Sequence, residues 1–270
     1  MSLSPSSRSS LVDFLHELAD AADKETMSHF RRPVQVDNKL EGGFDPVTVA
    51  DRDAEKAIRA LINAHYPEHG IIGEEFGREH DTAEHTWVLD PVDGTRAFIT
   101  GIPLWGSLIG LMANARPVLG MLSQPYTGER FWGTGAEAWH SGPLGSSTLK
   151  TRSCTAIPDA IMMTTAPQLF SEEEQPTYDA IEREAKHVRY GTDCYGYAMV
   201  ASGRCDAVVE SGLQIYDIMP LIPIIEGAGG VVTNWQGGDA TQGGRIVACG
   251  DPRLHEALLK KLSRVPDASS

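Results

Sequence analysis

Two stretches near the start of the chain carry apolar residues at helical spacing. The first begins at Ser10, a residue type that caps helices, and ends before Pro33; its apolar positions are Leu11, Leu15, Leu18 and Ala22. The second opens on Thr48-Val-Ala-Asp51, a capping-box pattern, and ends near Pro67; its apolar positions are Ala57, Ile58, Leu61 and Ile62. The sequence therefore predicts two helices, with a loop over residues 41–46 between them.

The apolar pattern changes between residues 87 and 133. Short apolar runs alternate here with turns, which is typical of successive antiparallel strands. Strands are predicted over residues 87–90, 104–112, 117–122 and 130–133. Residues 141–152 are rich in Gly, Ser and Thr, a composition that favours a domain boundary. The sequence thus predicts an N-terminal α+β domain over residues 1–145, with an antiparallel meander, and a C-terminal α/β domain over residues 146–270.

The second half alternates between predicted strands and predicted helices. Strands are expected over residues 161–165, 207–210, 231–234 and 246–249, and helices over residues 172–186, 193–202, 218–228 and 254–262. This alternation is typical of α/β layering. Pro223 conflicts with the helix over residues 218–228, because proline kinks a helix interior, unless that helix begins later.

Composition and charge exclude several classes of protein. The 270 residues include 23 Lys and Arg against 37 Asp and Glu, a net charge of −14, which argues against nucleic-acid binding. No apolar run approaches the roughly 18 residues of a membrane span, and the N-terminus lacks the apolar core of a secretory signal. The four cysteines include no C-x-x-C pair, so reduced thiols are expected rather than zinc ligands. We therefore expect a cytoplasmic protein with no membrane or nucleic-acid partner.

The strongest chemical signal is the segment Trp87-Val-Leu-Asp-Pro-Val-Asp-Gly-Thr-Arg-Ala-Phe98. Its buried strand delivers Asp90 to a sheet edge, and the Pro and Gly that follow turn the chain so that Asp93 returns toward Asp90. Two carboxylates held this close repel one another unless a cation lies between them. The short helix expected from Thr95 offers unpaired N–H groups that hold an anion. A cation site beside an anion site suits metal-assisted phosphate chemistry.

Each acidic group also has a simpler interpretation. Asp90 and Asp93 could satisfy backbone donors in a capped turn. The Glu74-Glu75 pair, which follows another apolar run, could be solvated surface. Asp217 stands at a predicted helix start, where it could cap the helix or face its dipole. The occurrence of all these groups in one chain, in this order, favours a common site.

Three stretches resemble the inositol monophosphatase superfamily, whose members are magnesium-dependent, lithium-sensitive phosphatases. They are Gly73-Glu-Glu75, the segment from Trp87 to Thr95, and Tyr216-Asp217 followed by Glu226-Gly-Ala-Gly-Gly230. The resemblance covers roughly residues 35–250. It implies a layered αβαβα sandwich of the α/β class, which agrees with the predicted elements, and it implies a homodimer.

The resemblance also implies a site. Its metal ligands would all be oxygen atoms, from Glu74, Asp90, the carbonyl of Val92, Asp93 and Asp217, and hard oxygen donors select Mg²⁺ over Zn²⁺. Glu74 and Thr95 would orient the attacking water, and the N–H groups of Gly94 and Thr95 would hold the phosphate. Lys39, Thr48 and Asp51 would lie near the metal and its water, although Thr48 could equally be a helix cap. The implied reaction is direct in-line hydrolysis by metal-activated water, without a phosphoenzyme.

Several departures from the inositol enzymes bear on the substrate. After the Asp-Gly-Thr, this chain continues Arg96-Ala-Phe98 where those enzymes usually carry Thr-Asn-Phe, and residues 100–107 and 191–197 are similar to the histidinol-phosphatase subgroup. Asp193 stands where inositol enzymes carry small apolar residues, although it could instead be a helix N-cap. Glu210 matches a family position that contacts the leaving group. Histidinol phosphate carries an ammonium and an imidazole, which added carboxylates favour over a neutral polyol.

The sequence therefore predicts a Mg²⁺-dependent phosphomonoester hydrolase that acts on histidinol phosphate, with Arg96, Asp193 and Glu210 as substrate-binding residues. An inositol-1-monophosphatase or a broad sugar phosphatase of the same fold is the first alternative. A catalytically silent cation-binding or regulatory protein is the second. The presence of Thr95 beside the acidic residues argues against silence, because cation binding alone would not need the threonine.

Overall fold

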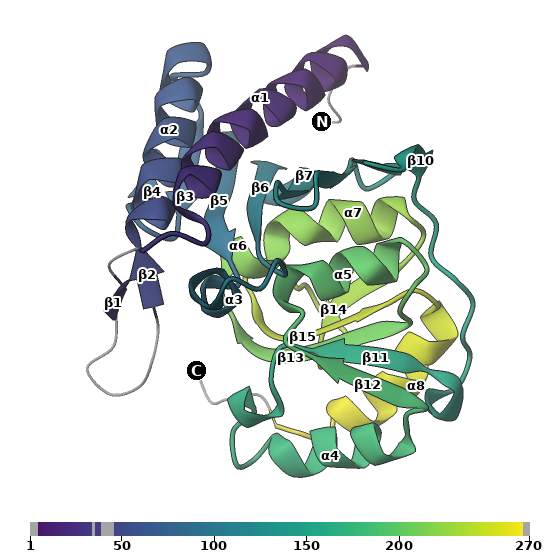
Figure 1. The fold of residues 1–270 in the computed structure, drawn as a ribbon. Coiled ribbons are helices and arrows are strands. Elements are labelled where there is room, and N and C mark those ends of the chain that lie inside the picture. Colours follow the sequence, from purple (N-terminus) through teal and green to yellow (C-terminus); the bar gives the residue numbers. More distant parts are fainter. Residues whose placement is uncertain (1–4, 34–35, 39–45, 267–270) are drawn as a thin grey trace.

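The computed structural model describes residues 5–33, 36–38 and 46–266, and it stacks helices and sheets in layers (Figure 1). An outer helix pair, an eight-stranded sheet, a central helix layer, a five-stranded sheet and a second outer helix pair follow one another. The helices of these layers are, in that order, α1 (Pro5–His29) and α2 (Val49–His65), α5 (Asp193–Ala201) and α7 (Ile222–Gly227), and α4 (Gln175–Glu184) and α8 (Pro252–Leu262). The predicted αβαβα sandwich is confirmed.

The eight-stranded sheet contains the predicted meander and the strand that carries the acidic motif. Its order is β10-β9-β8-β7-β6-β5-β3-β4, and β3 and β5 are its one parallel pair. Its strands are β3 (Gly70–Gly73), β4 (Gly77–Glu79), β5 (His85–Asp93), β6 (Gly106–Ala113), β7 (Arg116–Gln124), β8 (Glu129–Gly133), β9 (Ala138–Gly142) and β10 (Gly145–Thr148). The hairpin of β9 and β10 extends into the predicted boundary segment, residues 141–152, whose backbone groups complete the ladder at the sheet edge. The predicted boundary after residue 145 falls within β10, and the division into two domains stays a prediction.

The five-stranded sheet has the order β12-β11-β13-β15-β14, with β11 parallel to both of its neighbours. Its strands are β11 (Ile161–Thr164), β12 (His187–Tyr190), β13 (Ala207–Leu213), β14 (Val231–Asn234) and β15 (Gly244–Cys249). Of these five strands, β12 alone was not predicted, because it lies at an edge of the sheet, is mostly exposed and lacks an alternating apolar pattern. The remaining elements are β1 (Val36–Asn38), β2 (Pro46–Thr48), α3 (Thr95–Thr100), α6 (Ile215–Ile218) and the 3₁₀ turns η1 (Ile157–Asp159), η2 (Pro167–Leu169) and η3 (Met219–Leu221).

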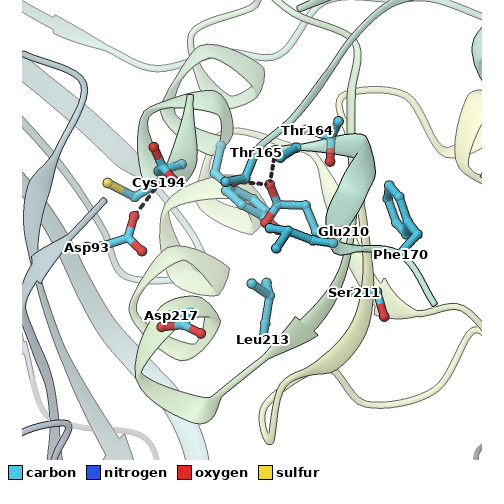
Figure 2. A pocket seen from close by; sticks show the side chains of 13 residues that line it. Asp93, Thr164, Thr165, Phe170, Cys194, Glu210, Ser211, Leu213 and Asp217 are labelled. Carbon is cyan, nitrogen blue, oxygen red and sulfur yellow. Dashed lines mark hydrogen bonds between the residues drawn. The ribbon is translucent and has the colours of Figure 1, made fainter. Parts of the chain in front are cut away.

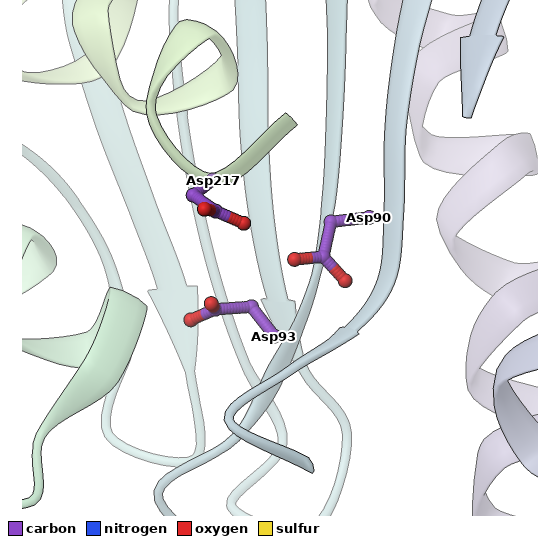
Figure 3. A group of neighbouring side chains, drawn as sticks. All are labelled: Asp90, Asp93 and Asp217. Carbon is purple, nitrogen blue, oxygen red and sulfur yellow. The ribbon is translucent and has the colours of Figure 1, made fainter. Parts of the chain in front are cut away.

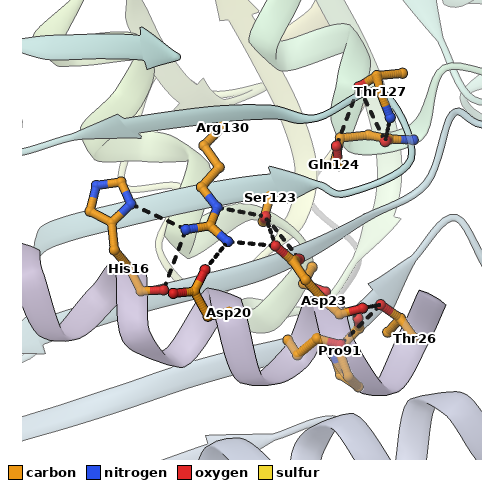
Figure 4. Close-up of polar contacts among 11 residues, drawn as sticks. His16, Asp20, Asp23, Thr26, Pro91, Ser123, Gln124, Thr127 and Arg130 are labelled. Atoms are coloured by element: carbon orange, nitrogen blue, oxygen red, sulfur yellow. Dashed lines mark hydrogen bonds and ion pairs between the residues drawn. The ribbon is translucent and has the colours of Figure 1, made fainter. Parts of the chain in front are cut away.

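Helix α1 is held on the eight-stranded sheet by apolar burial and by one arginine. Its start at Pro5 precedes the predicted start at Ser10, because proline is favoured in the first turn, where its missing N–H is not needed. The guanidinium of Arg130, on β8, contacts Asp20 and Asp23 of the helix, both at 2.6 Å (Figure 4). Leu18 is fully buried between the helix pair and the sheet, so the apolar spacing read from the sequence marks the face that packs.

The predicted helix over residues 218–228 is divided into η3 and α7, and α6 precedes it. Pro223 lies in the first turn of α7, so it kinks no helix interior. The broken segment lies flat against the sheet over three glycines, Gly110, Gly120 and Gly133, which stand opposite one another on β6, β7 and β8. A Cβ atom at Gly120 would lie 1.8 Å from the carbonyl oxygen of Pro220. This close approach brings α6, and with it Asp217, beside β5.

Candidate active site

The acidic site begins where the buried strand β5 ends. Asp90 and Asp93 are three residues apart, so a regular strand would point them to opposite faces of the sheet. The pairing of β5 with β6 shifts register between these two residues, and the irregularity allows both carboxyl groups to reach one site. Gly94 follows with a φ of 84°, a left-handed conformation that suits glycine, and it is the N-cap of α3. The predicted turn and short helix are therefore confirmed.

Asp217 joins these residues from α6, and its carboxyl group faces those of Asp90 and Asp93 (Figure 3). Asp90, Asp93 and Asp217, here called the acidic cluster, each offer a carboxylate oxygen, and these oxygens all lie within 4.8 Å of one another. The fold thus brings together acidic residues that are distant in the sequence, as the prediction of a common site requires. Burial and the charge of Glu74 raise the pKa of Asp90 well above its ordinary value, and burial and Asp193 do the same for Asp93.

Backbone N–H groups orient each carboxylate of the acidic cluster. The N–H of Val92 donates to Asp90 Oδ1 at 3.1 Å, and that of Cys194 donates to Asp93 Oδ2 at 2.6 Å. The N–H of Gln214 donates to Asp217 Oδ2 at 2.7 Å as part of a capping box at the start of α6. Asp90 and Asp217 therefore do accept nearby backbone N–H groups, as the simpler interpretation of each residue predicted. These hydrogen bonds do not compete with a common site, because capping orients the carboxylates that form it.

The acidic cluster opens into a cavity of about 380 Å³, here called the acidic cavity. Its lining includes most of the predicted site residues: Glu74, Asp90, Val92, Asp93, Gly94, Thr95, Arg96, Asp193 and Asp217. Glu74 follows β3, where its N–H donates to the carbonyl of Leu89 on β5 at 3.2 Å, and its side chain lies close enough to Asp90 to raise the pKa of that carboxyl group. The Thr95 hydroxyl donates to the carbonyl oxygen of Val92 at 3.0 Å. The structure thus brings all five predicted metal ligands to one cavity.

Thr48 and Asp51 lie behind this cavity rather than in its lining. Thr48 is the N-cap of α2, and its N–H and hydroxyl donate to Asp51 Oδ2 at 2.8 and 2.6 Å, as the capping-box pattern predicted. Both residues are buried, and burial, with a contribution from the charge of Glu74, raises the pKa of Asp51 to about 6. Their catalytic role stays a prediction. Lys39 lies outside the described residues.

A smaller pocket of about 130 Å³, here called the inner pocket, adjoins the acidic cavity (Figure 2). Glu210, on β13, is nearly fully buried in its wall; the N–H and hydroxyl of Thr165 donate to its Oε1 at 2.8 and 2.6 Å, and the Tyr197 hydroxyl donates to its Oε2 at 3.3 Å. Burial raises the pKa of Glu210 to about 7. Leu169, Phe170 and Leu213 add apolar surface, so the pocket combines a carboxyl group with apolar walls.

Asp193 lines both the acidic cavity and the inner pocket. It is the first residue of α5, with a φ of 42°, and its side chain lies beside Thr165 and is attracted by the exposed Arg96. Burial raises the pKa of Asp193 to about 6. The N-cap of α5 is Thr192, so the interpretation of Asp193 as the cap is wrong. The Asp193 carboxyl group instead lies where the acidic cavity and the inner pocket meet.

Sequence reasoning missed Thr165, Leu169 and Leu213, which complete the inner pocket. They come from β11, η2 and β13 and their connections, and none belongs to a motif with recognisable chemistry. The three residues share only their location: each lies at the end of an element, or just beyond it, on the side of the acidic cluster. That meeting depends on the sheet order, which the sequence pattern does not specify.

The residues of the acidic cavity fit a divalent metal ion. The donors of the acidic cluster are all carboxylate oxygens, the ligand type of hard cations. Burial and the charges of neighbouring acidic groups raise the pKa values of Asp90 and Asp93, because each negative charge disfavours the next. A cation bound among them would offset this repulsion and make the local electrostatic potential positive. A negatively charged phosphate ester could then approach the site.

Comparisons with known proteins agree with this reading of the site. A model of the inositol monophosphatase family matches residues 7–267. The chloroplastic bifunctional phosphatase IMPL2 of Arabidopsis thaliana is 40% identical over 91% of this chain and 72% of that protein, and a histidinol-phosphatase of Chlorobaculum parvum is 36% identical over 82% and 84%. The solved structure of an inositol monophosphatase from Zymomonas mobilis is 41% identical, covers 92% of this chain and 95% of that one, and has a TM-score of 0.81.

Fold, site and relatives together define a phosphoric monoester hydrolase. The chain belongs to the inositol monophosphatase family. Enzymes of this family are metal-dependent, in keeping with the acidic cluster. Among the residues that the structure describes, no helix has the length and apolarity needed to cross a membrane.

Proposed function

We propose that this phosphatase hydrolyses histidinol phosphate to histidinol and phosphate, with Mg²⁺ as its metal. The observation that carries the proposal is the placement of Asp193 and Glu210 around a pocket that opens from the acidic cavity. A phosphate held beside the acidic cluster would direct its leaving group toward this pocket. The similarity to a histidinol-phosphatase supports the same substrate.

Glu74, Asp90, Asp93, Asp217 and the carbonyl of Val92 would hold the metal, and their oxygen donors favour Mg²⁺. When bound, Mg²⁺ supplies Lewis-acid chemistry: it acidifies water and stabilises the charge that develops on the phosphate and on the leaving oxygen. The backbone N–H groups of Val92, Cys194 and Gln214 keep the carboxylates of the acidic cluster oriented. The protein's contribution to the metal site is therefore a set of fixed donors.

The remaining residues of the acidic cavity would bind the phosphate and orient the water. Glu74 and Thr95 would orient the attacking water and relay its proton, with the Glu74 carboxylate as the base, and the N–H groups of Gly94 and Thr95 would bind the phosphate oxygens. Arg96 is exposed at the cavity and could contact the same anion. Thr48 and Asp51 would act through Glu74, since they do not line the cavity.

The inner pocket would receive the leaving group. Histidinol carries an ammonium and an imidazole, and Asp193 and Glu210 offer carboxyl groups to them while Leu169 and Phe170 offer apolar surface to a ring. A neutral polyol has no cationic group to pair with these carboxyl groups. An inositol phosphatase or a broad sugar phosphatase is therefore the second candidate function. The homodimer implied by the resemblance and the cytoplasmic location expected from the composition stay predictions.

Asp193→Asn is expected to weaken hydrolysis of histidinol phosphate selectively. The lost charge-assisted contact is worth about 1.5–3 kcal/mol, so kcat/KM for histidinol phosphate should fall roughly tenfold to a hundredfold. Hydrolysis of glycerol 2-phosphate should barely change, because its leaving group carries no cation. Steady-state kinetics on both esters checks this, with Asp13→Asn, an exposed carboxylate of α1, as a charge-matched control. An equal loss on the two esters would show that Asp193 supports the structure instead of binding the substrate.

A further inference from the structure

A buried carboxyl group outside the cavity lining lies directly behind Glu74. Glu55, on α2, has no exposed side-chain surface, and its two oxygens accept backbone N–H groups from the loop that follows β3. Oε2 accepts the N–H of Glu75 at 2.8 Å, and Oε1 accepts the N–H of Phe76 at 3.2 Å. The donors are thus the two residues immediately after Glu74.

The loop is shaped to admit this carboxyl group. A Cβ atom on Gly73 would lie 2.0 Å from Glu55 Oε1, so a larger residue before Glu74 would force the glutamate side chain away. On the opposite side, the N–H of Glu74 donates to the carbonyl of Leu89 on β5. The backbone around Glu74 is therefore held between a strand of the acidic motif and a side chain of α2.

Arg59 offsets the charge of Glu55 within the same helix. Its Nε donates to Glu55 Oε1 at 2.8 Å, and its guanidinium also contacts Glu79 and the carbonyl oxygen of Gly77. A buried carboxylate is costly unless it is paired and its oxygens accept hydrogen bonds, and here both conditions are met. An apolar residue could fill the same space without the cost of burying a charge. The role of the carboxylate is therefore to accept the backbone N–H groups of Glu75 and Phe76.

We propose that Glu55 is a positioning residue, which fixes the loop after β3 so that Glu74 is directed at the acidic cluster before metal or substrate binds. The inference rests on the proposed function, because it gives Glu74 its role at the metal and the water. Outer partners that orient a ligand typically change metal affinity or activity by about 10–100-fold when they are removed. Glu55 would thus contribute to the reaction without lining the acidic cavity.

The variants Glu55→Gln and Glu55→Asp test this proposal, with Glu79→Gln as the matched control. Gln keeps the size but places an amide N–H₂ against backbone donors, and Asp keeps the charge but is too short to reach both N–H groups. Glu79 is the more exposed partner of Arg59, and its carboxylate accepts hydrogen bonds from Arg59 and Asn63 of α2 rather than from the Glu74 loop, so its loss should change activity by no more than about twofold.

Two readouts separate positioning from stability. With glycerol 2-phosphate as substrate, both Glu55 variants should lower kcat by about tenfold to a hundredfold with little change in KM, since the phosphate-binding turn is untouched. Calorimetric titration should show Mg²⁺ binding weakened by about tenfold or more. Wild-type kcat and Mg²⁺ affinity in a folded Glu55→Gln protein would overturn the proposal. A wild-type enzyme that binds no Mg²⁺ would overturn the proposed function as well.

A measurement on the wild-type protein covers the case in which the variants do not fold. Amide hydrogen exchange at Glu75 and Phe76 should be slow in metal-free protein, because both N–H groups are engaged by a buried acceptor, and Mg²⁺ should change it little. Fast exchange that becomes slow only when Mg²⁺ is added would show that the metal, and not Glu55, orders the loop, and would overturn the proposal.

Discussion

Removal of divalent metal with EDTA is expected to abolish phosphate release, and excess Mg²⁺ is expected to restore it. Without a cation, the acidic cluster and Glu74 repel a phosphate ester, and nothing stabilises the leaving oxygen. Ca²⁺ should inhibit, because its larger and looser coordination shell does not reproduce the octahedral geometry of Mg²⁺. A colorimetric phosphate assay on glycerol 2-phosphate, before and after each addition, measures the effect.

The control for this experiment is the fold of the metal-free protein. Circular dichroism and thermal unfolding in EDTA should show a folded chain, because the apolar layers on both sides of the sheets do not depend on the metal. Full phosphatase activity in EDTA, with no metal added, would contradict the whole interpretation of the acidic cluster.

Asp93→Asn is expected to lower kcat by roughly a hundredfold or more, because a charged ligand of the metal that stabilises the leaving oxygen is lost. The substitution keeps the shape of the turn, and the Asn carbonyl oxygen still accepts the N–H of Cys194. Removal of one negative charge relieves the repulsion within the cluster, so the metal-free variant should unfold at the same temperature as the wild type or at a higher one.

Steady-state kinetics at saturating Mg²⁺, together with thermal unfolding in EDTA, checks both parts of this expectation. Asp13→Asn again provides a charge-matched control on an exposed helix face. Near-normal turnover of Asp93→Asn would remove Asp93 from the metal site, even if the fold is unchanged.

The elements predicted from the sequence are those whose signals are local. The capping box of Thr48 and Asp51 fixes the start of α2, and the apolar run that ends at Asp90 is β5. The path of the chain between Asp217 and α7 could not be predicted, because it depends on Gly110, Gly120 and Gly133 meeting across three strands. Register between strands is a long-range property, and a window of sequence does not contain it.

The candidate site divides in the same way. Asp90 and Asp93 could be found because one turn holds them, and Asp217 was found because a family resemblance supplied the long-range link. Thr165 and Glu55 act through contacts with residues far away in the sequence, and neither belongs to a motif. Glu55 nevertheless carried a signal: it lies among the buried positions of an amphipathic helix, where an unpaired carboxylate is not tolerated.

The ratio of kcat/KM for histidinol phosphate to that for inositol 1-phosphate, measured side by side on the Mg²⁺-saturated wild-type enzyme, tests the central claim most directly. Asp193 and Glu210 at the inner pocket should favour the cationic leaving group, so we predict that histidinol phosphate is preferred by about tenfold or more. Equal rates, or a preference for inositol 1-phosphate, would contradict the account and assign the enzyme to the inositol or broad sugar phosphatases.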